Sequence, residues 1–167
     1  RRRLVQGCGP HGREGDGAII NWLSADDVRQ VAPIVAAGAA AAVNPGPREI
    51  VARIFVCPST DADKVREQAR FAIAAYLNVP VYAAFHRWLG RDSLQGMWDA
   101  WAAGDRKAAL AAIPDSVVDE LILHGSPESC REQIRRYVDA GVTTPALSVM
   151  GFADIDPVQA LRDLAPD

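Results

Sequence analysis

The clearest strand pattern in this chain is EIVARIFVC, at residues 49–57. It is rich in Val and Ile and lacks a clean alternation of polar and apolar residues, which is typical of a parallel strand covered on both faces. Two shorter runs have the same character, GAIINWL at residues 17–23 and PALSVMG at residues 145–151. The sequence therefore predicts three buried parallel strands.

Helical patterns lie between these runs. Ser24 is placed to cap a helix whose first turn carries two aspartates, which favour the positive end of the helix dipole. The apolar positions Val28, Val31 and Val35 follow at helical spacing. Pro33 is expected to break or kink this helix. Strands that alternate with helices predict an α/β fold with a parallel sheet.

A helical insertion is expected before the last strand. A helix opened by Asp61 should stop before Pro80, because the residue before a proline disfavours helical angles. Residues 81–120 then carry two apolar stripes at helical spacing. The stripes are Leu94, Met97, Trp98 and Trp101 on a helix over 93–104, and Val117, Val118, Leu121 and Ile122 on the next. We interpret the region as extra helices inserted into a strand-helix chain.

The arrangement of strands indicates a larger fold. Three parallel strands alone would leave both edges of the sheet open. They suit one part of a (β/α)8 TIM barrel, a fold that usually has about 250 residues or more. We therefore expect residues 16–167 to be the C-terminal portion of such a barrel, with about half of it missing on the N-terminal side. Residues 1–15 begin with Arg1 and lack periodicity, so they are either an irregular tail or the edge of a truncated sequence.

Composition and charge limit the classes of protein. The 167 residues are 49% hydrophobic and 23% charged, which fits about one globular domain. A formal net charge of -3 gives no reason to expect a nucleic-acid partner. There is neither an apolar run of the ~20 residues that span a bilayer nor an apolar signal region near the start. The three cysteines do not make a disulfide framework. We predict a cytoplasmic protein without membrane or nucleic-acid partners.

One segment, HGSPESC, begins at His124 and brings together the residue types of a catalytic set. Its spacing favours a structural interpretation. Ser126 is placed as the N-cap of a helix. Cys130 would share the packed face of that helix with Tyr137 and Val138, so we interpret it as a small core residue. No carboxylate lies at a useful spacing from His124, and a loop histidine with one local hydrogen bond is expected.

In a TIM barrel the chemistry lies in the loops where the strands end. The expected strand ends offer Asn21, Trp22, Ser24 and Cys57 as candidates for binding a cofactor or substrate, and Arg87 in the insertion could meet an anionic group. Structural alternatives stay open. Ser24 could serve only as a cap, Trp22 could simply pack, and Arg87 could form a surface ion pair. The three histidines lack ligand spacing, so no metal site is predicted.

Four segments together resemble the luciferase-like monooxygenase superfamily, the flavin- and deazaflavin-dependent barrels typified by bacterial luciferase. They are similar, in order, to the sixth barrel strand, the seventh strand with its helix, the following insertion, and the late helix with the eighth strand. The segments are GDGAIINWLSADDV (15–28), IVARIFVCPSTDADKVREQAR (50–70), YLNVPVYAAFHRWLG (76–90) and IPDSVVDELILHGSPESCREQIRRYVDAGVTTPALSVM (113–150). The order and spacing of all four carry the resemblance, which covers only the C-terminal half of the family's fold.

The resemblance implies a redox enzyme that binds coenzyme F420 or FMN at the barrel mouth. The sequences of these segments resemble the deazaflavin branch most. In that branch a hydride passes between the C5 atom of F420 and a small organic substrate. An FMN-dependent monooxygenase is the alternative within the family. The alternative of another class is a truncated, non-catalytic relative that serves as a structural or dimerisation module. A homodimer is implied by the resemblance only.

Two candidates can be carried over from the family by position. Asn21 and Ser24 match the loop after the sixth strand, which in relatives contributes to binding of the substrate or the cofactor phosphate. Relatives that hold a phosphorylated substrate there carry a lysine, whereas this chain has Asn-Trp-Leu-Ser, which argues against a sugar phosphate. The acid-base residues of the family lie on strands one to five. No catalytic residue is therefore assigned, and this portion alone is expected to be inactive.

Overall fold

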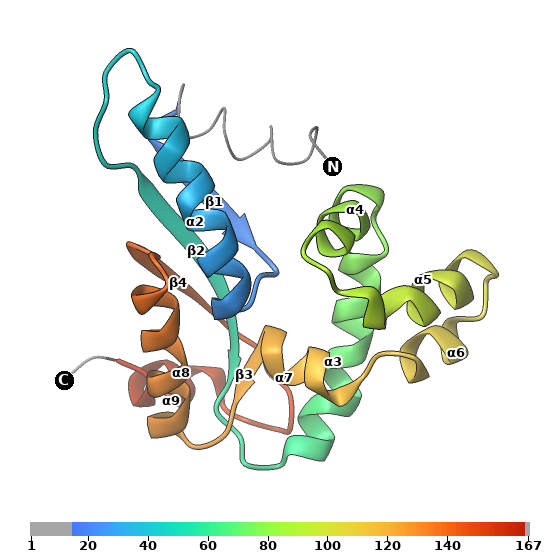
Figure 1. The fold of residues 1–167 in the computed structure, drawn as a ribbon. Coiled ribbons are helices and arrows are strands. Elements are labelled where there is room, and N and C mark those ends of the chain that lie inside the picture. The colour runs from blue at the N-terminus through green and yellow to red at the C-terminus, as the bar shows by residue number, and fades with distance from the viewer. Residues whose placement is uncertain (1–14, 166–167) are drawn as a thin grey trace.

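The computed structural model describes residues 15–165. In chain order the elements are β1 (Gly17–Asn21), α2 (Ala25–Ala40), β2 (Glu49–Cys57), α3 (Ala62–Leu77), α4 (Pro80–Trp88), a 3-10 turn (Asp92–Leu94), α5 (Gln95–Ala102), α6 (Arg106–Ala111), α7 (Asp115–Leu121), β3 (Ile122–His124), α8 (Pro127–Asp139), β4 (Thr144–Val149) and α9 (Pro157–Asp163). In Figure 1, α2, α8 and α9 lie on the left beside the strands, whereas α4, α5 and α6 lie on the right. Among the described residues, none of the helices combines the length and the apolar character needed to cross a membrane.

The strands form a parallel sheet centred on β2. β1 pairs with the first half of β2, from Gly17 opposite Glu49, and β3 pairs with its last residues, up to His124 opposite Cys57. β1 and β4 both pair with Ala52, so they lie on opposite edges of β2, and β3 continues the edge that β1 begins. The three predicted strands and the α/β class are confirmed.

Two local predictions are corrected, one for the stripe before β3 and one for the expected break at Pro33. The apolar stripe that was expected to be helical throughout ends in a strand, because Ile122 opens β3 and pairs with Phe55. A short buried apolar run fits helical and strand periodicity about equally well, which explains the error. The helix α2 does not break at Pro33 but continues to Ala40. Pro33 is exposed, so water can bond the Arg29 carbonyl that the proline leaves without a helical donor.

The two faces of the sheet have different surroundings. One face carries Ile50 and Ile54 and is buried beneath α2 and α8. The insertion covers the opposite face only near the ends of the strands, where Phe55 and Cys57 are buried. Further back on that face, Ile19 is 82% exposed in the middle of β1. A large apolar side chain in this position marks a sheet face without a covering layer.

The helical insertion between β2 and β3 is confirmed. α3 ends before Pro80, which opens α4 as its first residue. Leu94 and Met97 are buried in one core with residues of α3. Trp98 joins this core and donates its indole N–H to the carbonyl oxygen of Leu77 at 2.9 Å. The insertion therefore packs on α3 and reaches the sheet only at the ends of the strands.

Candidate functional site

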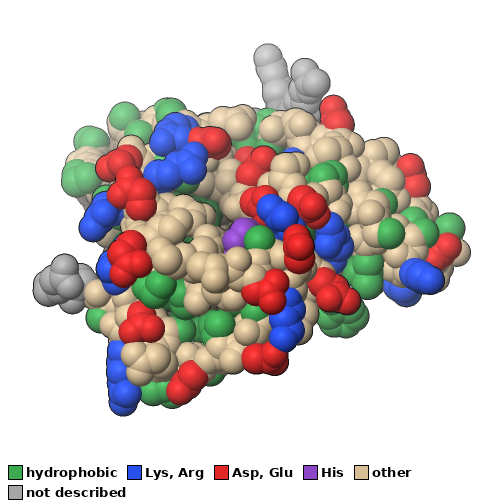
Figure 2. Space-filling model, turned by 90° about the horizontal axis from the view of Figure 1, so that it is seen from below, with side chains coloured by type: hydrophobic (Ala, Val, Ile, Leu, Met, Phe, Trp, Pro, Cys, Tyr) green, Lys and Arg blue, Asp and Glu red, His purple; other side chains and the backbone are tan. Residues whose placement is uncertain are grey.

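Three of the five predicted site residues lie where β1 leads into α2: Asn21 is the last residue of β1, and Trp22 and Ser24 lie in the turn that follows. β2 descends in Figure 1 towards the start of α3, so the view from below in Figure 2 faces the ends at which the strands finish. Acidic and basic side chains are interspersed over this side of the molecule (Figure 2). Open parallel sheets and barrels place their chemistry at these carboxyl ends.

The backbone of this turn reverses the direction of one large side chain. Asn21 pairs with Arg53, so its side chain points to the same face as Phe55. In a regular strand the next side chain would point to the opposite face. Trp22 instead has a φ of 58°, in the left-handed region, and its ring stacks on Phe55 with the centroids 4.0 Å apart. Both neighbouring residues therefore face the same side of the sheet.

Trp22 belongs to a group of aromatic side chains at the strand ends. Its ring also contacts Tyr76, at 5.1 Å between centroids, and Tyr76 meets Tyr82 edge-on at 6.3 Å. Asn21 donates its amide N–H to the Tyr82 hydroxyl at 3.4 Å. Two polar atoms in this group, the amide oxygen of Asn21 and the indole nitrogen of Trp22, are buried without a hydrogen-bond partner. Such atoms are rare enough in folded proteins to call for an explanation.

Arg53 is a residue of this face that sequence reasoning missed. Its guanidinium lies 4.7 Å from the Phe55 ring centroid and donates to the Ser148 hydroxyl at 3.2 Å. No carboxylate of the described residues forms a salt bridge with it. The available signal was a single cation inside the apolar run of β2, two positions before Phe55. An arginine in that setting can meet an anionic group.

A buried polar group lies behind the turn. It consists of the polar and charged side chains that the described residues bury most deeply: Ser24, Asp27, His86 and Arg91. Arg91 donates to the Asp27 carboxylate at 2.8 Å and to Nδ1 of His86 at 3.1 Å. Its other terminal nitrogen lies 2.6 Å from Glu120 and 3.4 Å from the Ser24 hydroxyl. Sequence reasoning placed Ser24 and the aspartates at the start of this helix but did not pair them with His86 and Arg91, because those residues come from a distant segment.

His86 is neutral in this group at physiological pH. Burial, reinforced by the positive charge of Arg91, lowers the pKa of His86 to about 4. A neutral imidazole can accept at one ring nitrogen, and Nδ1 accepts the hydrogen bond from Arg91. His86 therefore has a supporting role in the fold here.

The other two predicted residues lie elsewhere. Cys57 is buried at the end of β2, where its thiol contacts the carbonyl oxygen of Phe152 at 3.5 Å. Burial raises the pKa of the Cys57 thiol, which opposes formation of a nucleophilic thiolate. The guanidinium of Arg87 lies over Trp98 of α5, 4.0 Å from the ring centroid. The structure thus groups Asn21, Trp22 and Ser24 and leaves Arg87 in the insertion.

The HGSPESC segment is structural for the most part, as expected. Ser126 caps α8 by accepting from the Ser129 N–H at 3.2 Å. Cys130 is fully buried, and burial raises the pKa of its thiol to about 11. Two details are corrected. His124 does pair with a carboxylate, because its Nε2 lies 2.9 Å from Asp119, which is five residues earlier in α7. Val138, expected on the packed face of α8, is 48% exposed.

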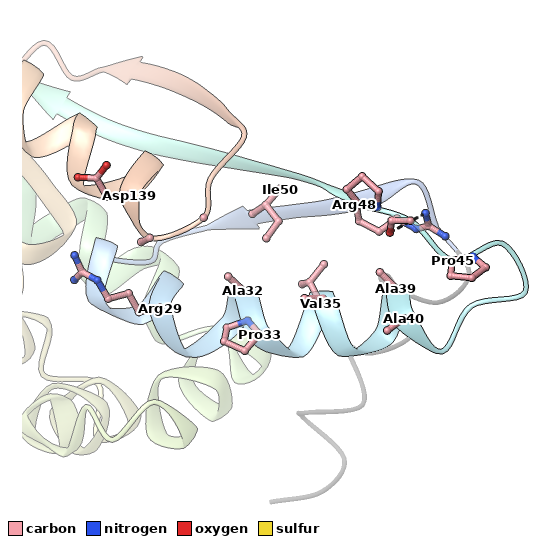
Figure 3. Close-up of a pocket in the computed structure, with 15 residues that line it drawn as sticks. Arg29, Ala32, Pro33, Val35, Ala39, Ala40, Pro45, Arg48, Ile50 and Asp139 are labelled. Atoms are coloured by element: carbon pink, nitrogen blue, oxygen red, sulfur yellow. Dashed lines mark hydrogen bonds between the residues drawn. The ribbon is translucent and has the colours of Figure 1, made fainter.

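Two hollows differ in their relation to the turn. The larger, of about 750 Å³, lies along the later part of α2, with Val35, Ala39 and Ile50 among its lining residues (Figure 3). Ile50 is near the start of β2, so this hollow is at the end of the sheet opposite the turn. A smaller cavity, of about 270 Å³, is lined by Ser24 and by Glu120. No group of side chains in the described part of the chain could hold a metal ion.

The parallel sheet, the strand ends and the insertion define an α/β protein of the kind that carries its site at the carboxyl ends of the strands. The chain belongs to the luciferase-like monooxygenase family, whose model matches residues 10–144. The resemblance found in the sequence is therefore confirmed.

Individual relatives match the same region. The chain is 27% identical over 136 residues to a 5,10-methylenetetrahydromethanopterin reductase from Methanolobus tindarius, covering 79% of this chain and 41% of that protein. The chain thus spans less than half the length of this curated relative. The fold is similar to the coenzyme F420-dependent tetrahydromethanopterin reductase from Methanopyrus kandleri, with a TM-score of 0.69, 18% identity, and coverage of 96% of this chain and 46% of that chain. It is also similar to an F420-dependent secondary alcohol dehydrogenase in complex with an F420-acetone adduct, with a TM-score of 0.60, 19% identity, and coverage of 87% and 40%.

Proposed function

We propose that this chain forms the C-terminal portion of an oxidoreductase that transfers a hydride between coenzyme F420 and a small organic substrate. The observation that carries the proposal is the turn after β1. There Asn21 and Trp22 face one aromatic group, and each has a buried polar atom without a partner. Membership of the family and the functions of the similar reductases support the same chemistry.

The partial barrel is part of this proposal. β1 and β4 are open edges of the described sheet, and Ile19 is 82% exposed on the face that a barrel would turn inwards. The relatives are more than twice as long as the region they share with this chain. Further strand-helix units from the same protein would pair with an open edge and enclose Ile19, which makes strands β1, β2 and β4 the sixth, seventh and eighth of the barrel.

The residues at the turn fit a deazaflavin. A flat aromatic ring matches Tyr76 and Tyr82, which are partly exposed, and Tyr76 contacts the buried ring of Trp22. The donors and acceptors along its edge match the unpartnered atoms of Asn21 and Trp22. Arg53 offers a positive charge to an anionic tail or substrate group. When bound, the coenzyme supplies the hydride donor or acceptor. We assign binding and orientation to these residues and no acid-base step.

The two alternatives make different predictions. An FMN-dependent monooxygenase of the same fold would bind FMN more tightly than F420, although the similar solved structures favour the deazaflavin. A truncated relative with only a structural or dimerisation role would bind neither. A homodimer, a cytoplasmic location and ligand contacts from Ser24, Cys57 and Arg87 remain predictions.

Titration of the complete protein with F420 and with FMN, followed by absorbance and fluorescence, tests the function. F420 should bind more tightly than FMN. The Asn21→Ala variant removes a partly buried amide at the site and should weaken F420 binding about tenfold, which corresponds to ~1.4 kcal/mol. Arg106→Met removes a guanidinium that stacks on Trp101 in the insertion and should leave binding unchanged. Absence of binding by both cofactors would overturn the redox proposal.

A further inference from the structure

The turn between β1 and α2 holds an unfavourable backbone conformation. Trp22 has a φ of 58°, where a bulky side chain is rarely found. Strain of this kind persists only where the surroundings determine the conformation, and it is concentrated at functional sites. Here the conformation turns the indole of Trp22 to the same face as Asn21.

The two residues after Trp22, Leu23 and Ser24, are held by hydrogen bonds from other segments and from the start of α2. The carbonyl oxygen of Leu23 accepts a hydrogen bond of 2.9 Å from the Tyr137 hydroxyl of α8. The backbone N–H of Ser24 donates to the Asp27 carboxylate at 2.8 Å. The Ser24 hydroxyl lies 3.4 Å from a terminal nitrogen of Arg91. The turn is thus held from α8, from its own helix and from the insertion.

Arg91 connects most of these contacts. One terminal nitrogen reaches Asp27 at 2.8 Å and His86 at 3.1 Å, and the other reaches Glu120 at 2.6 Å. A single planar guanidinium therefore links α2, α4 and α7 behind the turn. Lysine has one point charge and cannot reproduce this fork. Arg91 is 8% exposed and Asp27 is 5% exposed, so the pair is not a surface ion pair.

We propose that Arg91 is a positioning residue that keeps Trp22, whose side chain is 1% exposed, in its left-handed conformation, and so keeps Asn21, Tyr76 and Tyr82 in the arrangement that meets the ligand. The proposal rests on the proposed function only for the identity of the ligand. The conformation of the turn is a separate claim that needs no ligand. If Arg91 serves only to hold the insertion in place, its conservative replacement should shift the resonance of Trp98, which shares the core of the insertion, as much as that of Trp22.

The test uses the complete protein labelled with 5-fluorotryptophan. Trp22→Phe assigns the fluorine resonance of Trp22. The Arg91→Lys variant keeps the positive charge but loses the second terminal nitrogen that lets the guanidinium reach several partners. It should therefore shift or broaden the Trp22 resonance while a cooperative thermal transition remains. The matched control is Arg106→Met, because Arg106 stacks on Trp101 in the same insertion at 4.0 Å. It should shift the Trp101 resonance and leave that of Trp22 in place.

A second variant keeps the proposal testable if Arg91→Lys does not fold. Glu120 is a half-exposed partner of Arg91, and Glu120→Gln should give a smaller shift of the Trp22 resonance. In parallel, F420 titration of the folded variants should show binding weakened about tenfold by Arg91→Lys and unchanged by Arg106→Met. An unmoved Trp22 resonance in both Arg91→Lys and Glu120→Gln, or in Glu120→Gln alone if Arg91→Lys does not fold, would overturn the positioning role. Failure of the wild-type protein to bind F420 would instead count against the proposed function, because the fluorine spectra decide the positioning role independently.

Discussion

Two strands of the sheet are followed by turns that end in a serine-capped helix, and the two turns share their local chemistry. Ser24 at the start of α2 accepts from the Asp27 N–H at 3.2 Å, and Ser126 at the start of α8 accepts from the Ser129 N–H at 3.2 Å. Each turn also contains a residue with positive φ. In the α8 turn it is Gly125, for which this conformation costs little. In the α2 turn it is a tryptophan.

Beyond the caps the turns differ in burial and charge. The second acidic residue of α2, Asp27, is 5% exposed and pairs with Arg91. The acidic residue in the first turn of α8, Glu128, has a side chain that is 74% exposed and pairs with Arg131 across one turn of helix. A cap motif is therefore evidence only for a helix start. Strain in a bulky residue, together with buried charge, distinguishes the turn that we assign to ligand binding.

The largest expected difference between the turns is in stability. Asp27→Ala removes the main buried partner of Arg91 and leaves part of that charge uncompensated, so the free energy of unfolding should fall by about 3 kcal/mol. Glu128→Ala, the matched change in the α8 turn, removes an exposed pair that contributes little and should leave stability almost unchanged. Urea unfolding of the complete protein at neutral pH measures both. Equal losses from the two variants would show that the buried pair of Asp27 stabilises the protein no more than the exposed pair of Glu128.

The pH dependence of stability gives the next largest effect. The pKa of His86 is about 4 in the folded protein against 6.5 for an ordinary histidine, so below pH 6.5 the unfolded chain binds the proton more readily. The stabilising contribution is complete above pH 6.5 and is lost as the pH falls towards 4. By pH 4.5 the loss should be roughly 2 to 3 kcal/mol.

The control for this titration is His86→Gln, whose amide oxygen can still accept from Arg91 but has no proton to gain in this range. The free energy of unfolding of the wild-type protein and of His86→Gln is measured in urea at several pH values. As the pH falls, the wild-type protein should lose more stability than the variant. A difference that stays constant from pH 7 to pH 4.5 would show that His86 is not buried in its neutral form.

The contrast also shows what the sequence can predict. The runs of β1, β2 and β4, the caps at Ser24 and Ser126 and the burial of Cys130 follow from residues close together in the chain, and all were predicted. β3 was not, because three apolar residues directly after a helix carry no separate signal.

Which residues come together at the site depends on contacts between distant segments, and no local sequence pattern predicts those contacts. Arg91 is 64 positions from Asp27 and 29 from Glu120, so neither pairing can be read from spacing along a helix. The positive φ of Trp22 has no signal either, since sequence rules assign that conformation to glycine and asparagine. The sequence therefore identified the turn by its place after a strand, and only the fold revealed what holds it.

The smallest expected effect concerns the turn whose residue types look most like a catalytic set. Cys130 is fully buried and burial raises its thiol pKa to about 11, so it is a protonated core side chain at neutral pH. Cys130→Ala should leave turnover of the complete enzyme nearly unchanged, and native Cys130 should resist alkylation by iodoacetamide until the protein is unfolded in urea. The thermal transition of the same variant measures the effect on packing. Loss of one methyl-sized contact should lower stability without changing the residues of the site. Loss of turnover at unchanged stability would place chemistry at the α8 turn and remove the distinction between the two turns.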